Sequence, residues 1–242
     1  MNNEELQAIV AECLQNFYSR RLNSLSTLSL KATLRKKNPY LFRACGMQLA
    51  SEIVGAILTA HINSSDETIF GDAFFEPLVI YVSKGVVSPS EGVDIAIETA
   101  TVYKAISVKS GPNIFNSSQS KRQSDEFETL RRRLVKLQKQ FDPVLGTCYG
   151  KGSKPASDKR CYRIISGQAF WYELTGKVNF YQRICNAMST GVEEHRRQYE
   201  EEYSNALNRF TREFLLEFAK DDGAIDWNKL LQFNSGAELA EG

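Results

Sequence analysis

The chain of 242 residues is poor in the residues that build disulfide frameworks and zinc sites. Its 5 cysteines are scattered and odd in number, no two have C-x-x-C spacing, and the 2 histidines, His61 and His195, lie far apart. Structural zinc needs clustered cysteine and histidine ligands, and a disulfide framework favours an even set of cysteines. The sequence therefore argues against both kinds of site.

Long apolar runs and a basic N-terminal leader are also lacking. The chain starts with an acidic pair, Glu4 and Glu5, and no apolar run reaches the length of a membrane span. We therefore expect a cytoplasmic protein with no membrane partner. The net charge of +1 favours no class of ligand, because binding depends on where charges cluster.

Apolar residues recur at three- and four-residue steps in several segments, which predicts amphipathic helices. Helices are expected at residues 3–22, from Pro39 to about His61, and at 192–220, and residues 70–83 favour a helix over a buried strand. Further short helices are expected at 167–174 and around Trp227. In the helix that begins at Pro39 the expected core-facing residues are Leu41, Cys45, Leu49, Ile53 and Ile57.

The most informative stretch is residues 92–116. Two segments alternate apolar with polar residues and are joined by a short connection at residues 99–101, which predicts a β-hairpin carrying Asp94 on its first strand and Lys109 at the end of its second. A carboxylate can hold a hard divalent cation, and an ammonium can stabilise charge that develops on a phosphate. The hairpin therefore has the chemistry of phosphodiester hydrolysis.

These residues resemble the PD-(D/E)xK nuclease superfamily, and within it type II restriction endonucleases. The match consists of Asp94 and the run Ser107-Val108-Lys109-Ser110-Gly111, with weaker matches at 167–171 and 223–231. The resemblance implies a Mg²⁺-dependent endonuclease that cuts double-stranded DNA as a homodimer. It also implies Asp94 as metal ligand, the Val108 carbonyl beside it, and Lys109 as the group that orients water and stabilises charge.

One position departs from the superfamily pattern: Ser107 stands where an acidic residue normally precedes the lysine by two positions. Serine cannot replace a carboxylate as a strong metal ligand. We expect the second carboxylate to come from elsewhere, with Glu52 first, Glu76 close behind and Glu98 as a further candidate. If none supplies it, the alternative is a nuclease-fold protein that binds DNA without cutting it; a helical interaction protein that never meets nucleic acid ranks last.

A polar, basic stretch follows the motif and leads into a predicted helix with Phe127, Leu130, Leu134 and Leu137 on one stripe. Its start is typical of a phosphate-binding edge. The loop at residues 150–160, between expected strands at 144–149 and 161–165, adds further basic residues. The predicted DNA-binding residues are Ser110, Asn113, Asn116, Gln119, Lys121, Arg122, Lys151 and Lys154.

Residues 146–152 superficially resemble a nucleotide-binding P-loop, but the spacing is one residue short and Gly152 replaces the required Ser or Thr. A nucleoside triphosphatase is therefore rejected. We expect an α/β fold, a restriction-endonuclease-like mixed β-sheet flanked by helices, with additional N- and C-terminal helices. A single nuclease-like domain would comprise a helical arm at 1–37, a catalytic core at 38–175 and C-terminal helices at 176–234.

Overall fold

The computed structural model describes residues 1–112, 115–152, 160–189 and 191–236. The chain divides into two compact units, each made of two stretches of sequence. The sheet unit comprises Met1–Phe17 and Glu67–Val192, and the helical unit comprises Tyr18–Asp66 and Glu193–Gly242. The single nuclease-like domain expected over residues 1–242, with a helical arm at 1–37, a catalytic core at 38–175 and C-terminal helices at 176–234, stays a prediction.

A mixed five-stranded sheet forms the centre of the sheet unit, with its strands in chain order. β1 pairs antiparallel with β2 and β2 with β3, whereas β3–β4 and β4–β5 are parallel pairs. The predicted hairpin is confirmed, because β2 ends at Glu98 and β3 begins at Val102. The strands are β1 (Val86–Val87), β2 (Ile95–Glu98), β3 (Val102–Lys109), β4 (Gln140–Thr147) and β5 (Arg163–Ser166).

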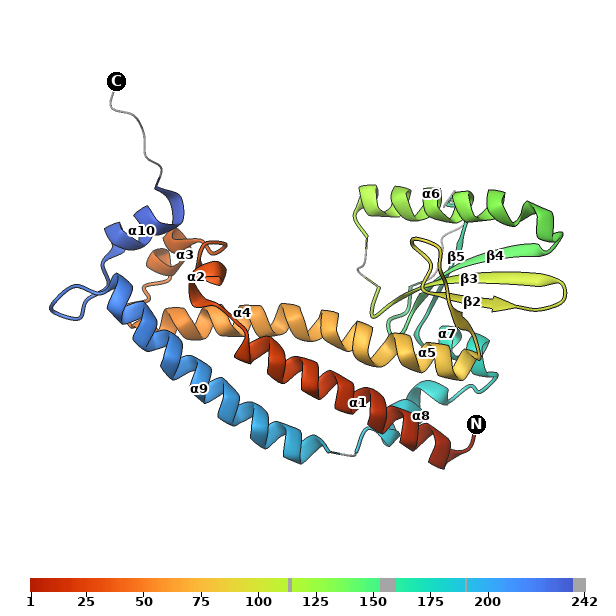
Figure 1. Ribbon diagram of the computed structural model, residues 1–242, viewed down its shortest axis with the longest axis horizontal. Helices are drawn as coiled ribbons and strands as arrows, with labels where there is room; N and C mark the ends of the chain where they lie inside the picture. The colour runs from red at the N-terminus through yellow and green to blue at the C-terminus, as the bar shows by residue number, and fades with distance from the viewer. Residues whose placement is uncertain (113–114, 153–159, 190, 237–242) are drawn as a thin grey trace, which may run out of the picture. The chain divides into compact units, whose positions relative to one another are not determined.

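Helices cover both faces of this sheet (Figure 1). On one face lies α6 (Ser117–Leu134), whose Phe127 and Leu130 are buried against Ala105, Leu145 and Tyr162. On the other lie α5 and α7, and α7 (Gly167–Thr175) contacts both β4 and β5. Parallel strands need a long crossover connection, which α6 supplies between β3 and β4. The predicted restriction-endonuclease-like α/β architecture is confirmed.

The helix that precedes the sheet changes its winding part-way. α4 (Ala50–Phe70) passes into a π-helical turn, η1 (Gly71–Phe75), and then into α5 (Glu76–Ser83). Pro77 is tolerated because it lies at the start of α5. The expected helix over residues 70–83 is therefore confirmed, although the π-helical turn was not predicted. η1 contacts β3, so this turn lies against the strand that carries Lys109.

The helical unit has a core of its own, in which Ile53 and Ile57 from α4 meet Phe210, Phe214 and Phe218 from α9. The helix expected at residues 192–220 is confirmed, and its three phenylalanines belong to this core. The helical unit comprises part of α1 (Asn3–Ser26), α2 (Leu30–Leu34), α3 (Pro39–Ala44), most of α4, α9 (Val192–Phe218) and α10 (Trp227–Ser235). Two further elements, α8 (Phe180–Ala187) and the 3₁₀ turn η2 (Val135–Leu137), belong to the sheet unit.

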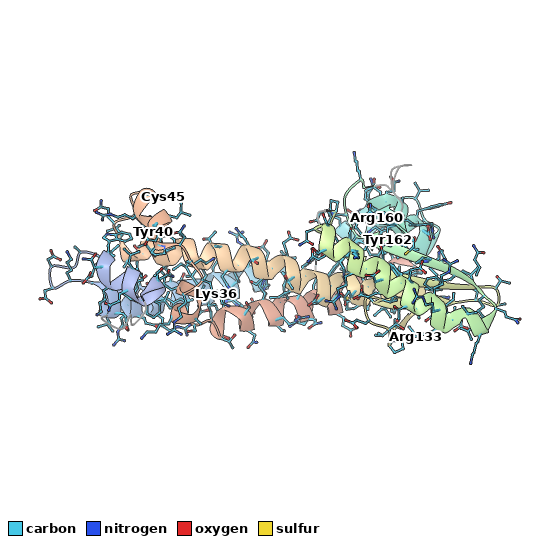
Figure 2. The ribbon with its side chains drawn as sticks, turned by 90° about the horizontal axis from the view of Figure 1, so that it is seen from above. Lys36, Tyr40, Cys45, Arg133, Arg160 and Tyr162 are labelled. Carbon is cyan, nitrogen blue, oxygen red and sulfur yellow. The ribbon has the colours of Figure 1, made fainter. Side chains whose placement is uncertain are left out.

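One predicted helix is wrong in part. The helix expected from Pro39 to His61 is two helices, because α3 ends at Ala44 and Gly46 adopts a positive φ of 72° before α4 begins. The break changes the helical phase, so Leu41 and Leu49 are 56% and 59% exposed, and Cys45 is exposed as well. Figure 2 shows Cys45 among the side chains of this segment. Only the Ile53 and Ile57 part of the expected stripe is core.

Other boundaries differ by a few residues. α1 continues to Ser26, β4 begins four residues earlier than expected, at Gln140, and the short strand β1 was not predicted. Leu137 is exposed because α6 ends at Leu134 and the chain turns through η2. Within the described ranges, every helix is too short or too polar to cross a lipid bilayer.

Candidate active site at the end of β3

Asp94 lies directly before β2 and opposite Ser107 of β3. The register Ile95 to Ile106 sets this placement, and the backbone of Asp94 is fixed from both sides. Its N–H donates to the carbonyl of Ile106 at 3.0 Å, and its own carbonyl accepts from the N–H of Ser88 at 3.0 Å. Two flanking segments therefore set the direction in which the carboxylate leaves the sheet.

The Asp94 carboxylate receives three donors from β3, all on Oδ2. The N–H of Val108 donates at 2.6 Å, the hydroxyl of Ser107 at 3.4 Å, and the ammonium Nζ of Lys109 lies 3.7 Å away. Ser107 and Lys109 are two residues apart on a strand and so share a face. The structure therefore brings together four of the predicted residues, Asp94, Ser107, Val108 and Lys109.

Asp94 and Lys109 are accessible, whereas Ser107 is not. The side chains of Asp94 and Lys109 are 28% and 31% exposed, but Ser107 is only 1% exposed. A substrate can therefore reach the carboxylate and the ammonium, while the serine acts only on its neighbours.

A small cavity of about 110 Å³ adjoins Lys109. Val108, Lys109 and Ser110 line it from the end of β3, and the facing wall comes from the end of α4, from η1 and from the start of α5. That wall carries three carboxylates, Glu67, Asp72 and Glu76. Of the three carboxylates that the sequence offered as a second ligand, Glu76 is therefore the one that lines this cavity with the lysine.

The approach of η1 to β3 is close. A Cβ atom on Gly71 would lie 2.7 Å from the hydroxyl oxygen of Ser110, so glycine allows this contact. Cys148, whose N–H donates to the carbonyl of Lys109 at 2.9 Å, is buried. Burial raises the pKa of the Cys148 thiol well above its usual value, and the nearby negative charge of Glu76 raises it further. The Glu76 carboxylate therefore lies near the ends of both β3 and β4.

Glu52, the first-ranked candidate in the sequence, belongs to the helical unit. Its Oε2 accepts the N–H groups of Leu49 and Gln48 at 3.0 and 2.9 Å, and these hydrogen bonds lower the pKa of Glu52. It therefore acts as a cap at the start of α4. Glu98, at the opposite end of β2 from Asp94, forms an ion pair with Lys139.

Sequence reasoning missed Glu67 and Asp72 as neighbours of the lysine. A usable signal was present, because Glu67, Asp72 and Glu76 recur at steps of four and five residues along one helical segment. Residues at such steps lie on one side of a helix, especially where a π-helical turn widens it.

The structure places the predicted DNA-binding residues in different surroundings. Ser110 lines the small cavity, and Lys121 and Lys151 are exposed. Asn116 and Gln119 form a capping box that starts α6, each side chain accepting the backbone N–H of the other. Asn113 and Lys154 lie outside the described residues.

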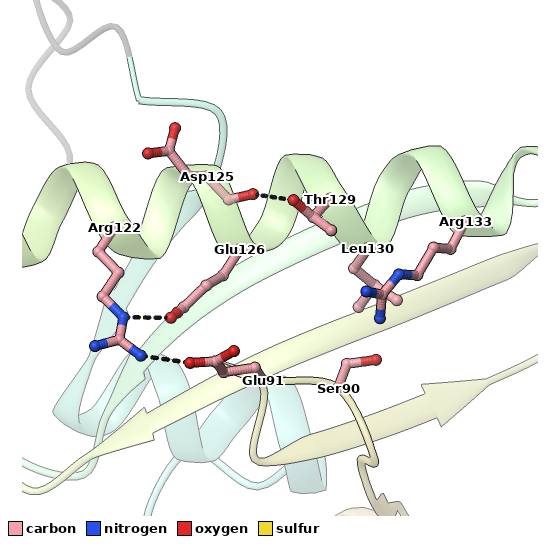
Figure 3. A pocket seen from close by; sticks show the side chains of 8 residues that line it. All are labelled: Ser90, Glu91, Arg122, Asp125, Glu126, Thr129, Leu130 and Arg133. Atoms are coloured by element: carbon pink, nitrogen blue, oxygen red, sulfur yellow. Dashed lines mark hydrogen bonds and ion pairs between the residues drawn. The ribbon is translucent and has the colours of Figure 1, made fainter.

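Arg122 lies in a surface pocket of about 390 Å³ between α6 and the loop before β2 (Figure 3). Its guanidinium bridges Glu126 and Glu91, and the pair with Glu126 has a distance of 2.8 Å. Gln123 fixes the same loop through a 2.7 Å bond from its side-chain amide to the carbonyl of Gly92. Arg122 therefore ties α6 to the loop that leads to Asp94.

The carboxylate and carbonyl oxygens near Lys109 are suitable ligands for a hard cation. Among the described residues no group of three or more His, Cys, Asp or Glu side chains is placed to hold a metal ion. Mg²⁺ does not need such a group, because it commonly binds one or two carboxylates and keeps several waters. Carboxylate and carbonyl oxygens, without sulfur or imidazole, are the chemistry that this ion prefers.

Comparison with known proteins decides the family. The family model of the type II restriction endonuclease EcoO109I matches residues 4–196. The chain belongs to the EcoO109I family. No curated protein matches the sequence. Membership of the EcoO109I family confirms the resemblance found in the sequence. The family is one of type II restriction enzyme-like nucleases, which implies DNA as the substrate class. Enzymes of this kind generally use divalent metal ions.

Proposed function

We propose that this EcoO109I-family chain is a Mg²⁺-dependent endonuclease that hydrolyses phosphodiester bonds of double-stranded DNA. The observation that carries the proposal is the position of Lys109, which lies 3.7 Å from the Asp94 carboxylate and lines the same small cavity as Glu76. Two carboxylates and one ammonium at a strand end form the minimal set of charges for this reaction.

Asp94 and Glu76 would hold the metal ion, with the carbonyl of Val108 as a third oxygen donor. When bound, Mg²⁺ lowers the pKa of a water molecule and neutralises charge on the phosphate. Glu76 takes the place that the sequence first gave to Glu52, because Glu76 shares a cavity with Lys109 whereas Glu52 caps α4.

Lys109 has two tasks in this proposal. Its ammonium balances the Asp94 carboxylate in the resting site, and it stabilises the negative charge that grows on the phosphate during attack by water. The side chain is partly exposed, so its Nζ can turn from Asp94 to a bound phosphate without breaking the strand.

Ser107 requires that a second carboxylate come from another element. A serine hydroxyl cannot replace a carboxylate as a strong metal ligand, and this residue is only 1% exposed. Ser107 instead donates a hydrogen bond to Asp94. The site thus keeps a polar contact at this position and takes its second negative charge from α5.

Exposed basic residues near the C-terminal end of α6 would hold the DNA backbone, together with Lys121 and Lys151. Each neutralised phosphate adds sequence-independent affinity that falls with salt. A homodimer would place one site on each strand, so that two protomers cut both strands. The basic residues in question are Arg131, Arg132, Arg133 and Lys136.

The test is cleavage of mixed plasmid and phage DNA with Mg²⁺ or EDTA, by wild type and by the Asp94→Ala and Lys109→Ala variants. Discrete Mg²⁺-dependent fragments that both variants lose by a factor of roughly 100 or more are expected. Fragments that persist in EDTA, or in either variant, would refute the assignment.

Ser107 also favours a second candidate, a nuclease-fold protein that binds DNA without cutting it. Loss of one carboxylate weakens metal binding and leaves the basic surface unchanged. Intact DNA together with a salt-sensitive shift in gel mobility, unaffected by Mg²⁺, would favour this candidate over the endonuclease.

A further inference from the structure

A second cavity, of about 520 Å³, lies wholly within the helical unit. It is enclosed by the end of α1, by α2 and the turn after it, and by α4. Five of its lining residues carry hydroxyl groups, two are lysines, Lys36 and Lys37, and one is His61. None of the lining residues is acidic, and none is Phe, Tyr or Trp.

The two lysines supply uncompensated positive charge. Neither Lys36 nor Lys37 forms an ion pair within the part of the chain that the structure describes, whereas Lys31, one turn earlier, pairs with Glu217 at 2.7 Å. Lys36, which is labelled in Figure 2, is exposed, whereas Lys37 is half-buried. Both lysines therefore line the cavity, and Lys36 is the more exposed of the two.

The backbone that carries these lysines is held in place. The side-chain amide of Asn234 in α10 donates to the carbonyls of Leu34 and Lys37 at 3.1 and 2.9 Å. The backbone N–H groups of Lys36 and Lys37 close the turn by donating to Thr33 and Leu34. A fixed turn reduces the entropy lost when the lysines bind a ligand.

His61 adds a donor to the same cavity. Its Nε2 lies 3.1 Å from the hydroxyl of Ser24, and the tautomer decides which group donates. In either neutral tautomer one N–H or O–H of the pair stays available as a donor. Burial lowers the pKa of His61, and the positive charge of Lys37 lowers it further, while Asp66 acts in the opposite direction. Lys37 and His61 therefore interact electrostatically across this cavity.

We propose that this cavity binds a phosphate group of the DNA backbone. The ligand is an anion, because the wall offers cations and hydroxyl groups and no carboxylate. It is held through its phosphate, because no Phe, Tyr or Trp side chain lines the cavity to stack a base. This inference rests on the proposed function and adds to it a sequence-independent contact in the helical unit, outside the cleavage site.

The first test compares two double variants in duplex binding, measured in EDTA over a range of salt concentrations. Lys36→Gln/Lys37→Gln should weaken binding about tenfold and reduce the slope of log K against log salt by about 1 to 2. The matched control, Lys220→Gln/Lys229→Gln, removes two exposed lysines of the same unit that do not line the cavity. Circular dichroism confirms that both variants fold. Equal binding by the two variants would overturn the proposal.

The second test follows the imidazole NMR signals, of which the chain has only two, from His61 and His195. The His61→Gln variant assigns them. A short duplex and inorganic phosphate are added separately, and a shift of the His61 signals with the duplex is expected. If phosphate moves them but the protein binds no DNA, the proposed function fails and the cavity is a site for a free phosphate. If neither moves them, the cavity is no anion site even where DNA is cut.

Discussion

At the scale of single residues, the geometry of Asp94 explains how a short motif encodes a site. Its Oδ2 receives one backbone and two side-chain donors from β3, and within the described ranges Oδ1 has no such contact. Oδ2 thus holds the hairpin, and Oδ1 is the oxygen that would bind the metal ion of the proposed function. This division depends on the strand register, which places Asp94 opposite Ser107.

The second carboxylate gives the residue-scale prediction. Glu76→Gln should lower the rate of Mg²⁺-dependent cleavage by roughly 100-fold, with partial recovery at high Mg²⁺, because it removes a ligand charge and little volume. Glu52→Gln is the matched control and should leave the rate unchanged while lowering the melting temperature slightly. Single-turnover cleavage over a Mg²⁺ titration measures both. The reverse pattern, with Glu52→Gln inactive, would restore the assignment made from the sequence.

Asp94 and Lys109 were predictable because both lie in one hairpin, where a period of two and a short turn fix their relation. Glu76 could be named as a candidate but not chosen over Glu52. That choice depends on how η1 approaches β3, which involves Gly71 and Ser110, residues with no chemical signature of their own.

At the scale of elements, a network of charges joins β3, β4, β5 and α7. Arg163 pairs with Asp142 and with Glu173 at 2.7 and 2.8 Å, and Lys104 reaches Glu173 at 2.7 Å. Hydrogen bonds from Arg163, and then from Lys104, lower the pKa of Glu173 from 4.5 to about 2, against the effect of burial. The network therefore fastens α7 to the parallel half of the sheet.

This network predicts a pH dependence of stability. Because the folded pKa of Glu173 lies below the unfolded one, its contribution is complete above about pH 5 and is lost as the pH falls from about 4.5 to 2. Glu173→Gln should therefore be less stable than wild type at pH 7, and the difference should shrink towards pH 3. Urea denaturation at pH 7, 5 and 3 measures it. Glu194→Gln, which removes an exposed pair with Arg197, is the control and should differ little at any pH.

The contact between β4 and α7 gives another prediction. A Cβ on Gly146 would overlap the ring of Phe170, so Gly146→Ala should destabilise the fold by about 1–3 kcal/mol. Gly55→Ala, where nothing lies within 4 Å of the new Cβ, should be neutral or stabilising by up to about 1 kcal/mol, since alanine favours a helix. Urea denaturation separates the two, and an unchanged Gly146→Ala midpoint would contradict the packing described for β4.

Elements with many repeats of one pattern were predicted well from the sequence, and elements fixed by one backbone angle were not. α6, α7 and the β2–β3 hairpin follow their periodicity. The break between α3 and α4 depends on the positive φ of Gly46 and on the cap supplied by Glu52, and the two-residue strand β1 is too short for any pattern.

At the scale of the whole molecule, the proposed homodimer can be tested through the products of mixed dimers. When wild type is mixed and re-equilibrated with excess Asp94→Asn, most active dimers should hold one functional site and should nick circular plasmid instead of cutting both strands. Gel electrophoresis distinguishes nicked from linear DNA. Light scattering should give twice the 27.3 kDa of one chain. A monomer that makes double-strand breaks would refute the prediction.

The core of the helical unit joins residues 25–62 to residues 206–230, and the larger part of the sheet unit, residues 67–192, is encoded between them. The two parts of this core are therefore synthesised at different times. The ribosome extends the chain from the N-terminus at about 5–20 residues per second, so Ile53 and Ile57 wait roughly 7–30 s for Phe210 and Phe214. β5 ends at Ser166, well before α9 begins at Val192. The whole β-sheet is therefore synthesised before the second part of the helical unit's core. Until then α2 and α4 lack their core partners from α9 and α10, so these are the segments that a chaperone would bind.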